Sequence, residues 1–599
     1  MVNRPARTSN RRFGRRALLK GTAATGVAVA TGGGASVGSA GAMQDATPGA
    51  TPDRGPLGPS PSVAELQQAL ADGANTVRDI VQAAILRIEA IDRQGPTLNA
   101  VIELNPEALA IADELDAELA AGTPRGPMHG IPVLIKDNIA TGDQMETTAG
   151  SLSLVGLKAT ADSTLAWRLR EAGMVILGKT NLSEWANIRS FSSTSGWSGR
   201  GGQTGNPYQV DRNPSGSSSG SGAAAAVGYV AVTIGTETNG SIVSPAGNCG
   251  VVGIKPTVGL VSRHGVIPIS HSQDTIGPMA RTVADAAALL TVMAGPDAYD
   301  PASTGIWPVP PSSDATPAAT PDAAPGATPE VGILPFPSYP LQPLARVSVV
   351  DYVSVLDPNG LSGARIGVVR QLAGFSHHAD SVFEEALAVL AAAGAELVDP
   401  VEVPSLADDA WGADTLPVLE WELKAGLADY FADFLPEGSP ITSLADVIAF
   451  NEEHAAEEMP WFDQAIFLSA EARTGLDDPA YVQAVLNIQQ AGRANGIDAA
   501  LQQHSLDALI APTNGPATRI DLVNGDHWLG GTSTLAAIAG YPLVTVPAGY
   551  RHGLPVGITF MGTAFSEATL IRLAYAFEQA AGVWQAPTLV PPGILPPEA

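Results

Sequence analysis

Hydrophobic residues along the chain follow two spacings that alternate. At 62–88 and near 106–121 they recur mostly at three- and four-residue steps, which predicts helices. Short continuous apolar runs, typical of buried strands, occur at 131–135, 174–177, 230–234 and 251–254. Because strand-like runs alternate with helical stretches, the pattern predicts an α/β fold in which helices cover a sheet.

The same alternation returns in the second half of the chain. A strand-like run at 364–369 precedes a long stretch, 380–500, in which helical spacing dominates. Two further strand-like runs follow at 508–511 and 543–547. No internal repeat divides the pattern, so we expect one large domain over about 61–590.

Two low-complexity segments lack the apolar spacing of a folded domain. Residues 43–60 are rich in Pro, Gly, Thr and Ala, which predicts a tether in front of the domain. A second segment at about 308–330 repeats Ala, Thr and Pro and cannot bury a core. We therefore expect it to be an insertion that loops out of the domain.

The first 42 residues resemble an export signal. The run R-R-A-L-L-K at 15–20 resembles the twin-arginine motif, a weakly apolar stretch follows at 22–31, and A-G-A at 40–42 offers a cleavage site. The apolar stretch is too short to span a membrane as a helix. We therefore expect twin-arginine export to the periplasm, cell envelope or extracellular space, without stable membrane insertion after signal removal. A basic disordered tail is the alternative.

The charge balance argues against a nucleic-acid partner. The chain has 60 acidic and 32 basic residues, for a net charge of −28. Seven of the basic residues and none of the acidic ones lie in 1–42, so the remainder carries 25 basic against 60 acidic residues, or −35. Such a surface repels phosphate backbones. The single cysteine, Cys249, excludes an internal disulfide and a cysteine-cluster metal site, and we expect it to be a small buried thiol.

One lysine and two serines carry the candidate chemistry. Lys136 lies in G-I-P-V-L-I-K-D-N, Ser217 opens S-S-S-G-S-G, and Ser241 lies in G-T-E-T-N-G-S-I. Serine and lysine together can make an activated nucleophile if burial lowers the lysine pKa from about 10.4. An apolar strand directly before Lys136 makes its desolvation plausible, and glycines around both serines permit close backbone approach. We expect the lysines at 158, 179, 255 and 424 to have structural or surface roles, and Asp137, Asn138 and Asp274 to fix loops rather than react.

The same motifs, taken in order, resemble the amidase signature family. The lysine segment is followed by N-P-S-G-S-S-S-G-S-G-A-A-A-A-V at 213–227 and G-T-E-T-N-G-S-I-V-S-P-A at 235–246. Segments G-V-V-G-I-K-P-T-V-G-L-V-S, S-Q-D-T-I-G-P-M-A-R-T and G-Y-P-L-V-T-V-P-A-G also match, so the resemblance covers nearly all of 61–590. It implies an α/β/α fold with a large mixed sheet of about 11 strands, covered by helices on both faces.

The resemblance also implies an activity and a set of roles. The chain is expected to hydrolyse a carboxylic amide to an acid plus ammonia or an amine through an acyl-serine intermediate, with neither metal nor organic cofactor. Ser241 resembles the nucleophile, and Lys136 resembles the base that relays protons through Ser217. Ser217 is expected to follow a cis peptide bond from Gly216, and Ser218 is a candidate hydrogen-bond partner of Lys136. The oxyanion hole is expected to consist of four backbone N–H groups, those of Thr238, Asn239, Gly240 and Ser241.

Two departures from the family pattern keep alternatives open. Glu237 stands where many members have Asp, and Val243 stands where many amidotransferase-type members have Arg. The segments 195–204 and 450–460 look most like bacterial peptide amidases and their secreted relatives, which favours a small-molecule or peptide amide substrate. An amidotransferase-type glutaminase subunit with a tRNA-handling partner, and a catalytically silent binding protein, are the alternatives. Nothing in the sequence indicates an oligomeric state.

Three other motifs suggest different chemistry. Residues 173–180 match the phosphate-binding pattern G-x-x-x-x-G-K-T, but the intervening residues are those of a buried strand. Residues 216–220 match the esterase pattern G-x-S-x-G, but a turn rather than a strand precedes them. His377 and His378 hint at metal, but no third ligand is placed, so we expect a solvated pair.

Overall fold

The computed structural model of the protein describes residues 59–304, 306–308, 341–343, 350–408 and 410–591. All of these residues belong to one unit. The expected export signal at 1–42, nearly all of the expected tether at 43–60, and the insertion from 309 onward lie outside the described residues. Those three expectations therefore stay predictions.

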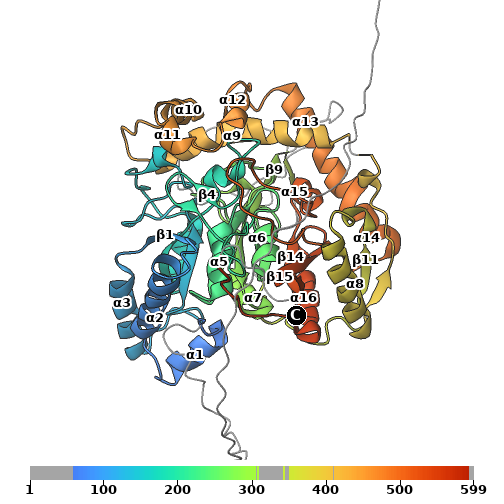
Figure 1. Cartoon of the computed structure of the whole chain (residues 1–599), viewed down its shortest axis with the longest axis horizontal. Helices are drawn as coiled ribbons and strands as arrows, with labels where there is room; N and C mark the ends of the chain where they lie inside the picture. Colours follow the sequence, from blue (N-terminus) through green and yellow to red (C-terminus); the bar gives the residue numbers. More distant parts are fainter. Residues whose placement is uncertain (1–58, 305, 309–340, 344–349, 409, 592–599) are drawn as a thin grey trace, which may run out of the picture. The chain divides into compact units, whose positions relative to one another are not determined.

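A mixed sheet of eleven strands forms the centre of the unit (Figure 1). Its order is β1 (Val101–Leu104), β3 (Val175–Thr180), β2 (Pro132–Lys136), β6 (Val232–Glu237), β8 (Thr275–Ala280), β7 (Val252–Lys255), β14 (Leu543–Arg551), β15 (Leu554–Met561), β13 (Ala508–Pro512), β11 (Arg365–Val368) and β12 (Glu396–Val398). Strand β2 runs parallel to β3 and β6, and β11 runs parallel to β12 and β13. All other neighbours in this sheet are antiparallel, and the expected large mixed sheet is confirmed.

The parallel strands are buried on both faces, which explains their continuous apolar sequences. In β2, Val133 and Ile135 belong to one hydrophobic cluster, whereas Leu134 between them belongs to another. In β3, Ile176 packs in the first cluster and Val175 in the second. Successive side chains point to opposite faces of a strand, so the two clusters are the cores on the two sides of the sheet.

Helices cover both faces, as expected. The helices that pack in the first core are α1 (Val63–Ala71), α4 (Thr164–Glu171), α7 (Val283–Met293), α8 (His377–Ala392) and α16 (Glu567–Ala581). The helices that pack in the second core are α2 (Val77–Ile88), α3 (Ala108–Ala120), α5 (Ser219–Val227) and α6 (Val243–Cys249). Two further helices, α14 (Asp498–His504) and α15 (Thr534–Ala539), pack with α6 and β13–β15. No helix in the described part of the chain combines the length and apolar content that crossing a membrane requires.

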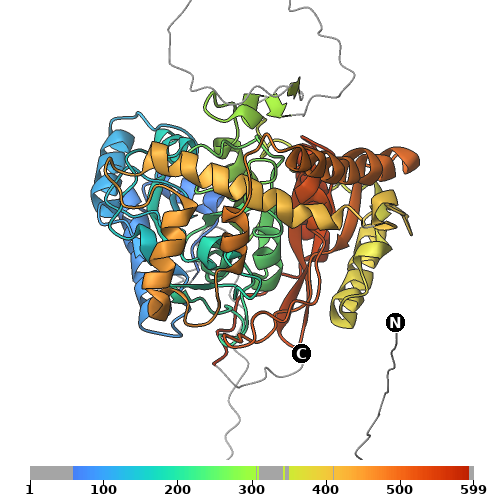
Figure 2. The same ribbon diagram turned by 90° about the horizontal axis from the view of Figure 1, so that it is seen from above.

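A separate helical layer packs mainly on loops rather than on the sheet. It consists of α9 (Gly412–Phe434), α10 (Leu444–Glu453), α11 (Ala455–Glu458), α12 (Ala465–Glu471) and α13 (Pro479–Gly492). These helices lie together at the top of Figure 1, and in Figure 2 the long helix α9 runs across the view. The apolar side chains of α9, α10 and α12 meet Trp185, Ile188 and Ile267, which lie in loops between sheet strands. Helix α13 packs instead with α9 and with Ile538 of α15.

The helical pattern at 62–88 divides into two helices. Ser62 and Thr76 each begin a helix with a capping box, in which the side chain and a carboxylate three residues later exchange hydrogen bonds with the backbone. Gly73, with φ of 66°, lies between α1 and α2. A left-handed residue of this kind ends a helix, and glycine adopts it without steric cost.

Two short ribbons complete the described strands. They pair β4 (Trp197–Ser198) with β5 (Gly202–Gln203) and β9 (Ile306–Pro308) with β10 (Leu341–Pro343). The first ribbon lies within the segment 195–204 that follows the loop at 183–195. That loop contacts the residues before Ser217, so the first ribbon belongs to the surroundings of the candidate site.

Candidate active site

Lys136 is placed by the pleat of the sheet. It is the last residue of β2, and alternation puts its side chain on the same face as Leu134. Helix α5 packs on that face, and its first turn follows directly after Ser217 and Ser218. A lysine and a Ser/Gly run 81 positions apart therefore meet where a strand ends and a helix begins.

The Lys136 amine is completely buried among hydroxyl groups. Its Nζ lies 2.7 Å from Ser217 Oγ, 3.2 Å from Ser218 Oγ and 2.9 Å from Thr236 Oγ1. The Thr236 carbonyl oxygen is 3.3 Å away. Ser217 and Ser218 are also fully buried, so the amine meets the first serine without intervening solvent.

Burial lowers the pKa of Lys136 to about 7, although the negative charges of Asp274 and Glu237 act in the opposite direction. The N-terminus of α5, with Ser218 at its cap, carries partial positive charge that also disfavours an ammonium ion. A substantial fraction of the amine is therefore neutral near neutral pH. Only the neutral form has a lone pair that can accept a proton.

The surrounding hydrogen bonds orient that lone pair. Ser218 Oγ donates to the Thr236 carbonyl (3.0 Å) and so is left with lone pairs that accept from Thr236 N–H (3.2 Å) and from Lys136. Thr236 Oγ1 accepts from Asn138 Nδ2 at 3.0 Å as well as from Lys136. A neutral amine that donates its two protons to Ser218 and Thr236 directs its lone pair at the Ser217 hydroxyl.

Two glycines let the segment around Ser217 come this close. The Gly216–Ser217 peptide bond is cis, the configuration that the family resemblance implies. A Cβ at Gly216 would lie 2.2 Å from Ser183 Oγ, and a Cβ at Gly235 would lie 2.6 Å from Ser218 Oγ. Any larger residue at either position would displace these hydroxyl groups.

Ser241 lies between the end of β6 and the start of α6. The Ser218 N–H donates to the Ser241 carbonyl oxygen at 3.1 Å, which holds the two serine segments together. Ser241 is 8% exposed. Within the described residues its hydroxyl has no hydrogen-bond partner, so it is available to an incoming group.

One of the four N–H groups expected in the oxyanion hole has a hydrogen-bond partner within the protein. The Gly240 N–H donates to Glu237 Oε1 at 2.9 Å, and its role in the oxyanion hole stays a prediction. Glu237 Oε2 accepts from the N–H groups of Ile242 and Val243, so this carboxylate organises the turn into α6. Among the described residues, the N–H groups of Thr238, Asn239 and Ser241 have no acceptor, and their role in an oxyanion hole stays a prediction.

The sequence did not predict that three further residues belong to the site. Thr236 accepts a hydrogen bond from Lys136, and Asn138 donates to Thr236. Asp274 accepts from Thr238 Oγ1 at 2.5 Å, and it accepts from two backbone N–H groups of its own loop. Asn138 and Asp274 therefore fix loops, as expected, and these loops belong to the site. Nothing local marks Thr236, because its role depends on the pairing of β6 with β2.

Lys179 and Lys255 are also buried. Of the two roles expected for them, structural or surface, the surface role is therefore excluded. Lys179 donates to the Ile139 carbonyl at 2.5 Å and to Thr147 Oγ1 at 2.9 Å, and Lys255 donates to the Tyr541 carbonyl at 2.7 Å. Burial lowers the pKa of each to about 8. Both roles are structural. Because Lys179 is a buried residue of β3, the phosphate-binding reading of 173–180 is excluded.

The other residues that the sequence suggested for different chemistry are Cys249, the histidine pair and the motif at 216–220. Cys249 ends α6 and is fully buried, and burial raises the pKa of its thiol. His377 and His378 begin α8 with tilted rings whose centroids are 3.8 Å apart. In the described part of the chain, no group of three or more His, Cys, Asp or Glu side chains could hold a metal ion. No strand precedes Ser218 directly, so the esterase pattern at 216–220 lacks its structural context.

Comparison with known proteins identifies the family. The family model described as Amidase matches residues 79–361 and 338–571. The chain belongs to the amidase family. Its similarity to "Probable amidase At4g34880" of Arabidopsis thaliana is 39% identity over 536 residues, which cover 88% of this amidase and 91% of the relative.

Solved structures support the same conclusion. The native peptide amidase from Stenotrophomonas maltophilia is 47% identical, with a TM-score of 0.76 over 88% of this amidase and 98% of that chain. A peptide amidase in complex with the competitive inhibitor chymostatin is 48% identical, with a TM-score of 0.77 and the same coverage. This amidase therefore has the amidase-signature α/β fold and is an amide hydrolase.

Amidotransferase subunits are similar at lower identity. A glutamyl-tRNA(Gln) amidotransferase subunit from Prochlorococcus marinus (strain MIT 9303) is 33% identical over 539 residues, covering 87% of this amidase and 98% of that protein. In this amidase, Val243 is buried at the start of α6, in an apolar cluster. The position at which many such subunits carry Arg therefore offers no charge to a substrate carboxylate.

Proposed function

We propose that this amidase cleaves amides through an acyl-enzyme intermediate on Ser241, with Lys136 as the base and Ser217 as the proton relay. The observation that carries the proposal is the 2.7 Å contact between Lys136 Nζ and Ser217 Oγ in surroundings with no solvent exposure. An amine that is partly neutral near pH 7 is a competent general base under physiological conditions.

The proposed reaction has two halves. Lys136 takes the Ser217 proton as Ser217 takes the Ser241 proton, and Ser241 Oγ attacks the carbonyl carbon of the amide. The proton returns through Ser217 to the leaving nitrogen, the carbon–nitrogen bond breaks, and ammonia or an amine departs. Water then attacks the acyl-serine by the same relay and releases the acid. Backbone N–H groups of the turn before α6 stabilise the oxyanion in both halves.

Replacement of the nucleophile tests the proposal. Ser241→Ala is expected to abolish turnover while the protein stays folded, because the proposed acyl-enzyme forms on the Ser241 hydroxyl. A fluorophosphonate probe is expected to label wild-type enzyme at Ser241 and not the variant. Ser354→Ala, which removes an exposed hydroxyl, is the matched control and keeps wild-type activity and labelling. Normal ammonia release by Ser241→Ala, or labelling at a different serine, contradicts the assignment.

For the substrate class, we favour an amide with an apolar side chain near the reacting carbonyl, as in a peptide C-terminal amide. Three large apolar side chains are exposed on neighbouring loops: Phe191 by 71%, Trp528 by 60% and Trp461 by 42%. Exposed aromatic side chains that gather in one place are typical of recognition surfaces. The 47% identity to a peptide amidase supports the same substrate class.

Hydrogen bonds connect these loops to one another and to the site. Ser190 Oγ donates to Asp463 Oδ1 at 2.6 Å, which joins the loops of Phe191 and Trp461. Asp526 accepts from the Ser195 N–H at 2.9 Å and from Asn213 Nδ2 at 2.7 Å. Asn213 leads directly to Ser217, so the loop of Trp528 is tied to the residues before the relay serine.

An activity panel distinguishes the substrate classes. Blocked peptide C-terminal amides that end in an aromatic residue are expected to give a higher kcat/KM than the same peptides ending in glycine, and than small aliphatic amides. Phe191→Ala and Trp528→Ala should reduce the difference in kcat/KM between peptides that end in an aromatic residue and peptides that end in glycine. Trp167→Ala, an equally exposed tryptophan on α4, should not. A preference for small aliphatic amides contradicts a peptide substrate.

We also propose export by the twin-arginine route. The R-R-A-L-L-K run, the apolar stretch and the A-G-A site support it, and a chain with a single cysteine has no need of an oxidising compartment for folding. N-terminal sequencing of protein from the cell exterior is expected to begin near Met43. Conservative replacement of Arg15 and Arg16 by lysine is expected to retain the protein inside the cell. Equal export of that variant contradicts the proposal.

The two alternatives make opposite predictions. An amidotransferase subunit would be retained in the cytosol with a tRNA-handling partner. Buried Val243 and a net charge of −35 beyond residue 42 argue against that role. A silent binding protein would release no ammonia from any amide. Co-purification with a partner identifies the first alternative, and an ammonia-release assay identifies the second.

A further inference from the structure

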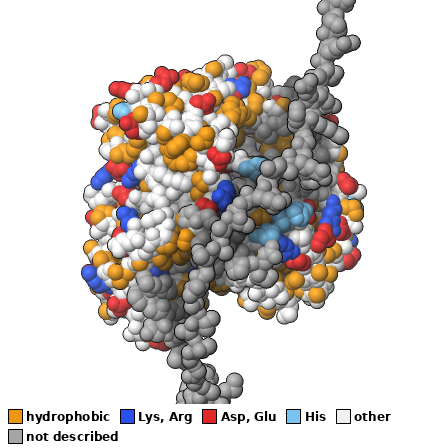
Figure 3. Space-filling model, viewed as in Figure 1, with side chains coloured by type: hydrophobic (Ala, Val, Ile, Leu, Met, Phe, Trp, Pro, Cys, Tyr) orange, Lys and Arg blue, Asp and Glu red, His pale blue; other side chains and the backbone are white. Residues whose placement is uncertain are grey.

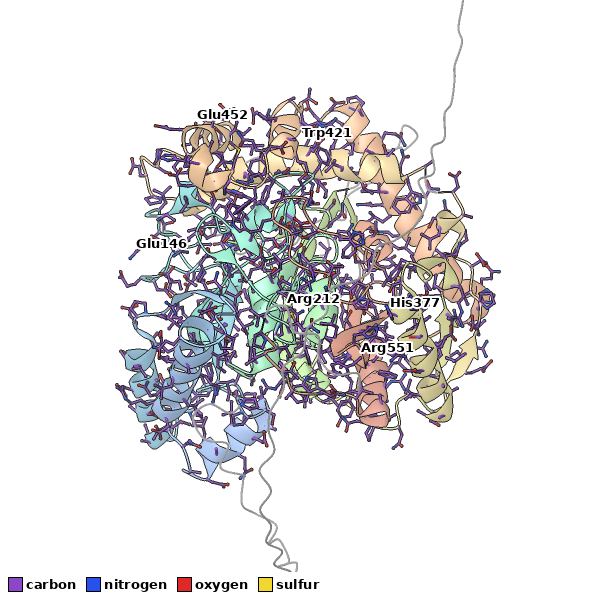
Figure 4. The ribbon with its side chains drawn as sticks, viewed as in Figure 1. Glu146, Arg212, His377, Trp421, Glu452 and Arg551 are labelled. Atoms are coloured by element: carbon purple, nitrogen blue, oxygen red, sulfur yellow. The ribbon has the colours of Figure 1, made fainter. Side chains whose placement is uncertain are left out.

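A cavity of about 790 Å³ is lined by none of the residues of the proposed catalytic relay. Its walls come from the loop at 516–529, the end of the β14–β15 hairpin, the start of α8 and Arg212. Figure 4 labels Arg212, His377 and Arg551, which bring three distant parts of the sequence to this region. A cavity of this volume lies within the usual range for sites that hold a small molecule.

The lining is basic although the chain is strongly acidic. Three arginines and three of the nine histidines line the cavity: Arg212, Arg519, Arg551, His378, His527 and His552. In Figure 3, histidine side chains gather beside Lys and Arg side chains on the right of the view. In a protein with 60 acidic and 32 basic residues, such a concentration of basic groups is not what an average surface would show.

Two of the arginines lie directly opposite each other. Arg212 and Arg519 form an isolated antiparallel bridge, which brings their side chains onto neighbouring positions. Like charges placed opposite each other across two paired strands destabilise the pairing. Asp211 forms long ion pairs with both, 3.9 Å from Arg212 and 3.8 Å from Arg519, so one carboxylate faces two guanidinium groups. One negative charge offsets only one of the two positive charges, and the pair keeps a net positive charge.

Most of their hydrogen-bonding capacity is unused. Arg212 donates through Nε to Gln209 at 3.0 Å, but its two Nη groups have no acceptor among the described residues. The guanidinium of Arg519 has none there either, and its side chain is 63% exposed. Arg551, in contrast, donates to Ser381, Glu385 and the Tyr550 carbonyl and is fully engaged.

The acidic residues of the cavity do not balance this charge, because their oxygens are already bonded elsewhere. Asp521 accepts from Val523 N–H and from both N–H groups of Asn524. Asp526 accepts from Ser195 and Asn213. Partial burial and the neighbouring positive charges of His377, His552 and Arg551 lower the pKa of His378, which shows that this region already disfavours one more cation.

We propose that this cavity binds a small anion with a carboxylate or phosphate group, held by the guanidinium groups of Arg212 and Arg519. A guanidinium presents parallel N–H groups that match two oxygens of either anion. An anion between the two arginines also removes the repulsion across their bridge. His527 and His378, in the same walls, supply further donors to the remainder of the molecule.

The site adjoins the segment that precedes the relay serine. Residues 516, 518, 526, 527 and 529 also line a smaller cavity that reaches Ser215. Ser215 Oγ is hydrogen-bonded to Ser244 Oγ of α6 at 2.8 Å. A bound anion therefore lies next to the loop at 213–217 without contacting the proposed nucleophile.

Titration calorimetry at low ionic strength tests the proposal, with inorganic phosphate and succinate as separate probes. Wild-type enzyme is expected to bind at least one of them with a Kd in the millimolar range or below. Arg519→Gln should weaken binding by about tenfold, as expected for the loss of a charge-assisted hydrogen bond, and Arg212→Gln with Arg519→Gln should remove it. Phosphate binding points to a phosphorylated ligand, and succinate binding points to a carboxylic acid.

The control is Arg78→Gln, which removes an exposed, ion-paired arginine on α2 and should leave binding unchanged. Circular dichroism should show that Arg519→Gln is folded, since that side chain is mostly exposed. Binding of neither probe to wild-type enzyme, or equal binding to the double variant, overturns the proposal. The readout does not depend on amide hydrolysis, so its failure is separate from a failure of the proposed function.

Discussion

Two buried lysines on neighbouring parallel strands differ in what surrounds them. Lys136 ends β2, and Lys179 lies next to Thr180 at the end of β3, in register with Ile135. Both are fully buried, and burial lowers both pKa values, to about 7 and about 8. Lys136 meets the hydroxyl groups of two serines and a threonine, whereas Lys179 meets a backbone carbonyl and one threonine.

The comparison shows that desolvation alone does not make a base. An amine acts as a base only toward a group that can give up a proton, and a carbonyl oxygen has none to give. The Ile139 carbonyl beside Lys179 can only accept, and the Thr147 hydroxyl donates its own proton to that same carbonyl at 3.4 Å, so the Lys179 amine serves as a donor to both. Lys136 contacts Ser217, whose hydroxyl can both give and take a proton. The group that contacts a buried lysine amine therefore determines whether that lysine is structural or can act as a catalytic base.

The largest expected difference is between the activities of two variants, each of which lacks one of these lysine amines. Lys136→Ala should lower kcat/KM by at least roughly 1000-fold with the fold retained, because the general base is lost. Lys179→Ala should keep kcat near wild type for each folded molecule. Ammonia release, normalised to the folded fraction by circular dichroism, measures both. Equal loss of activity in the two variants would remove the distinction.

Stability should respond in the opposite order. Lys179→Met leaves the Ile139 carbonyl with only the long hydrogen bond from Thr147 and takes a compensating charge from buried Asp137, so we expect a loss of about 3 kcal/mol of unfolding free energy. Lys136→Met should cost less, because Ser218 and Thr236 keep other partners. Urea unfolding of the two variants and wild type, followed by fluorescence, gives the comparison. A more stable Lys179→Met would contradict it.

The pH dependence of activity should report Lys136 alone. Its pKa of about 7 means that the amine is protonated at lower pH and neutral at higher pH. Only the neutral amine accepts a proton, so kcat/KM should fall by roughly tenfold per unit below pH 7 and level off above it. A pH profile of wild type and of Lys179→Ala should show the same acidic limb. A limb near pH 10, or none, would mean that another group is the base.

Replacement of Asp274 should have a smaller effect on the pH dependence of activity. Among the carboxylates, Asp274 has the largest influence on the Lys136 pKa. The negative charge of Asp274 raises the Lys136 pKa, so Asp274→Asn should lower that pKa and move the acidic limb to lower pH. We expect this shift to be smaller than the effect of burial, which is the largest influence on the Lys136 pKa. The position of the limb, rather than the maximal rate, is the readout, since Asp274 also holds Thr238. A shift to higher pH would contradict the assignment.

Much of the fold follows from local sequence. The strands at β2, β3, β6 and β7 were indicated by continuous apolar runs, because a strand between two helical layers has no polar face. Their bounds differ from the predicted ones by one to three residues at each end, since the last residues of β3 and β6 are polar yet buried. The helical pattern at 62–88 lacked the break at Gly73, whose left-handed backbone places a turn there.

The site was predictable in its residues but not in its contacts. Lys136, Ser217, Ser218 and Ser241 were named from motifs, and the structure brings the first three together. The roles of Thr236 and of Glu237, which takes the Gly240 N–H, could not be inferred, because both depend on how β6 leads into the turn before α6. No local pattern encodes which donor reaches which acceptor once a loop has folded.

By itself, the sequence determined which segments are apolar enough to form the sheet and its covering helices, and which residue types stand at the strand ends. Those are local properties, since period and burial depend on neighbouring side chains. Only the tertiary structure decided that Lys136 and not Lys179 faces a serine hydroxyl, and that Arg212 meets Arg519 across a bridge. Both depend on the pairing and register of segments far apart in the chain, and that register is set by packing of the whole core.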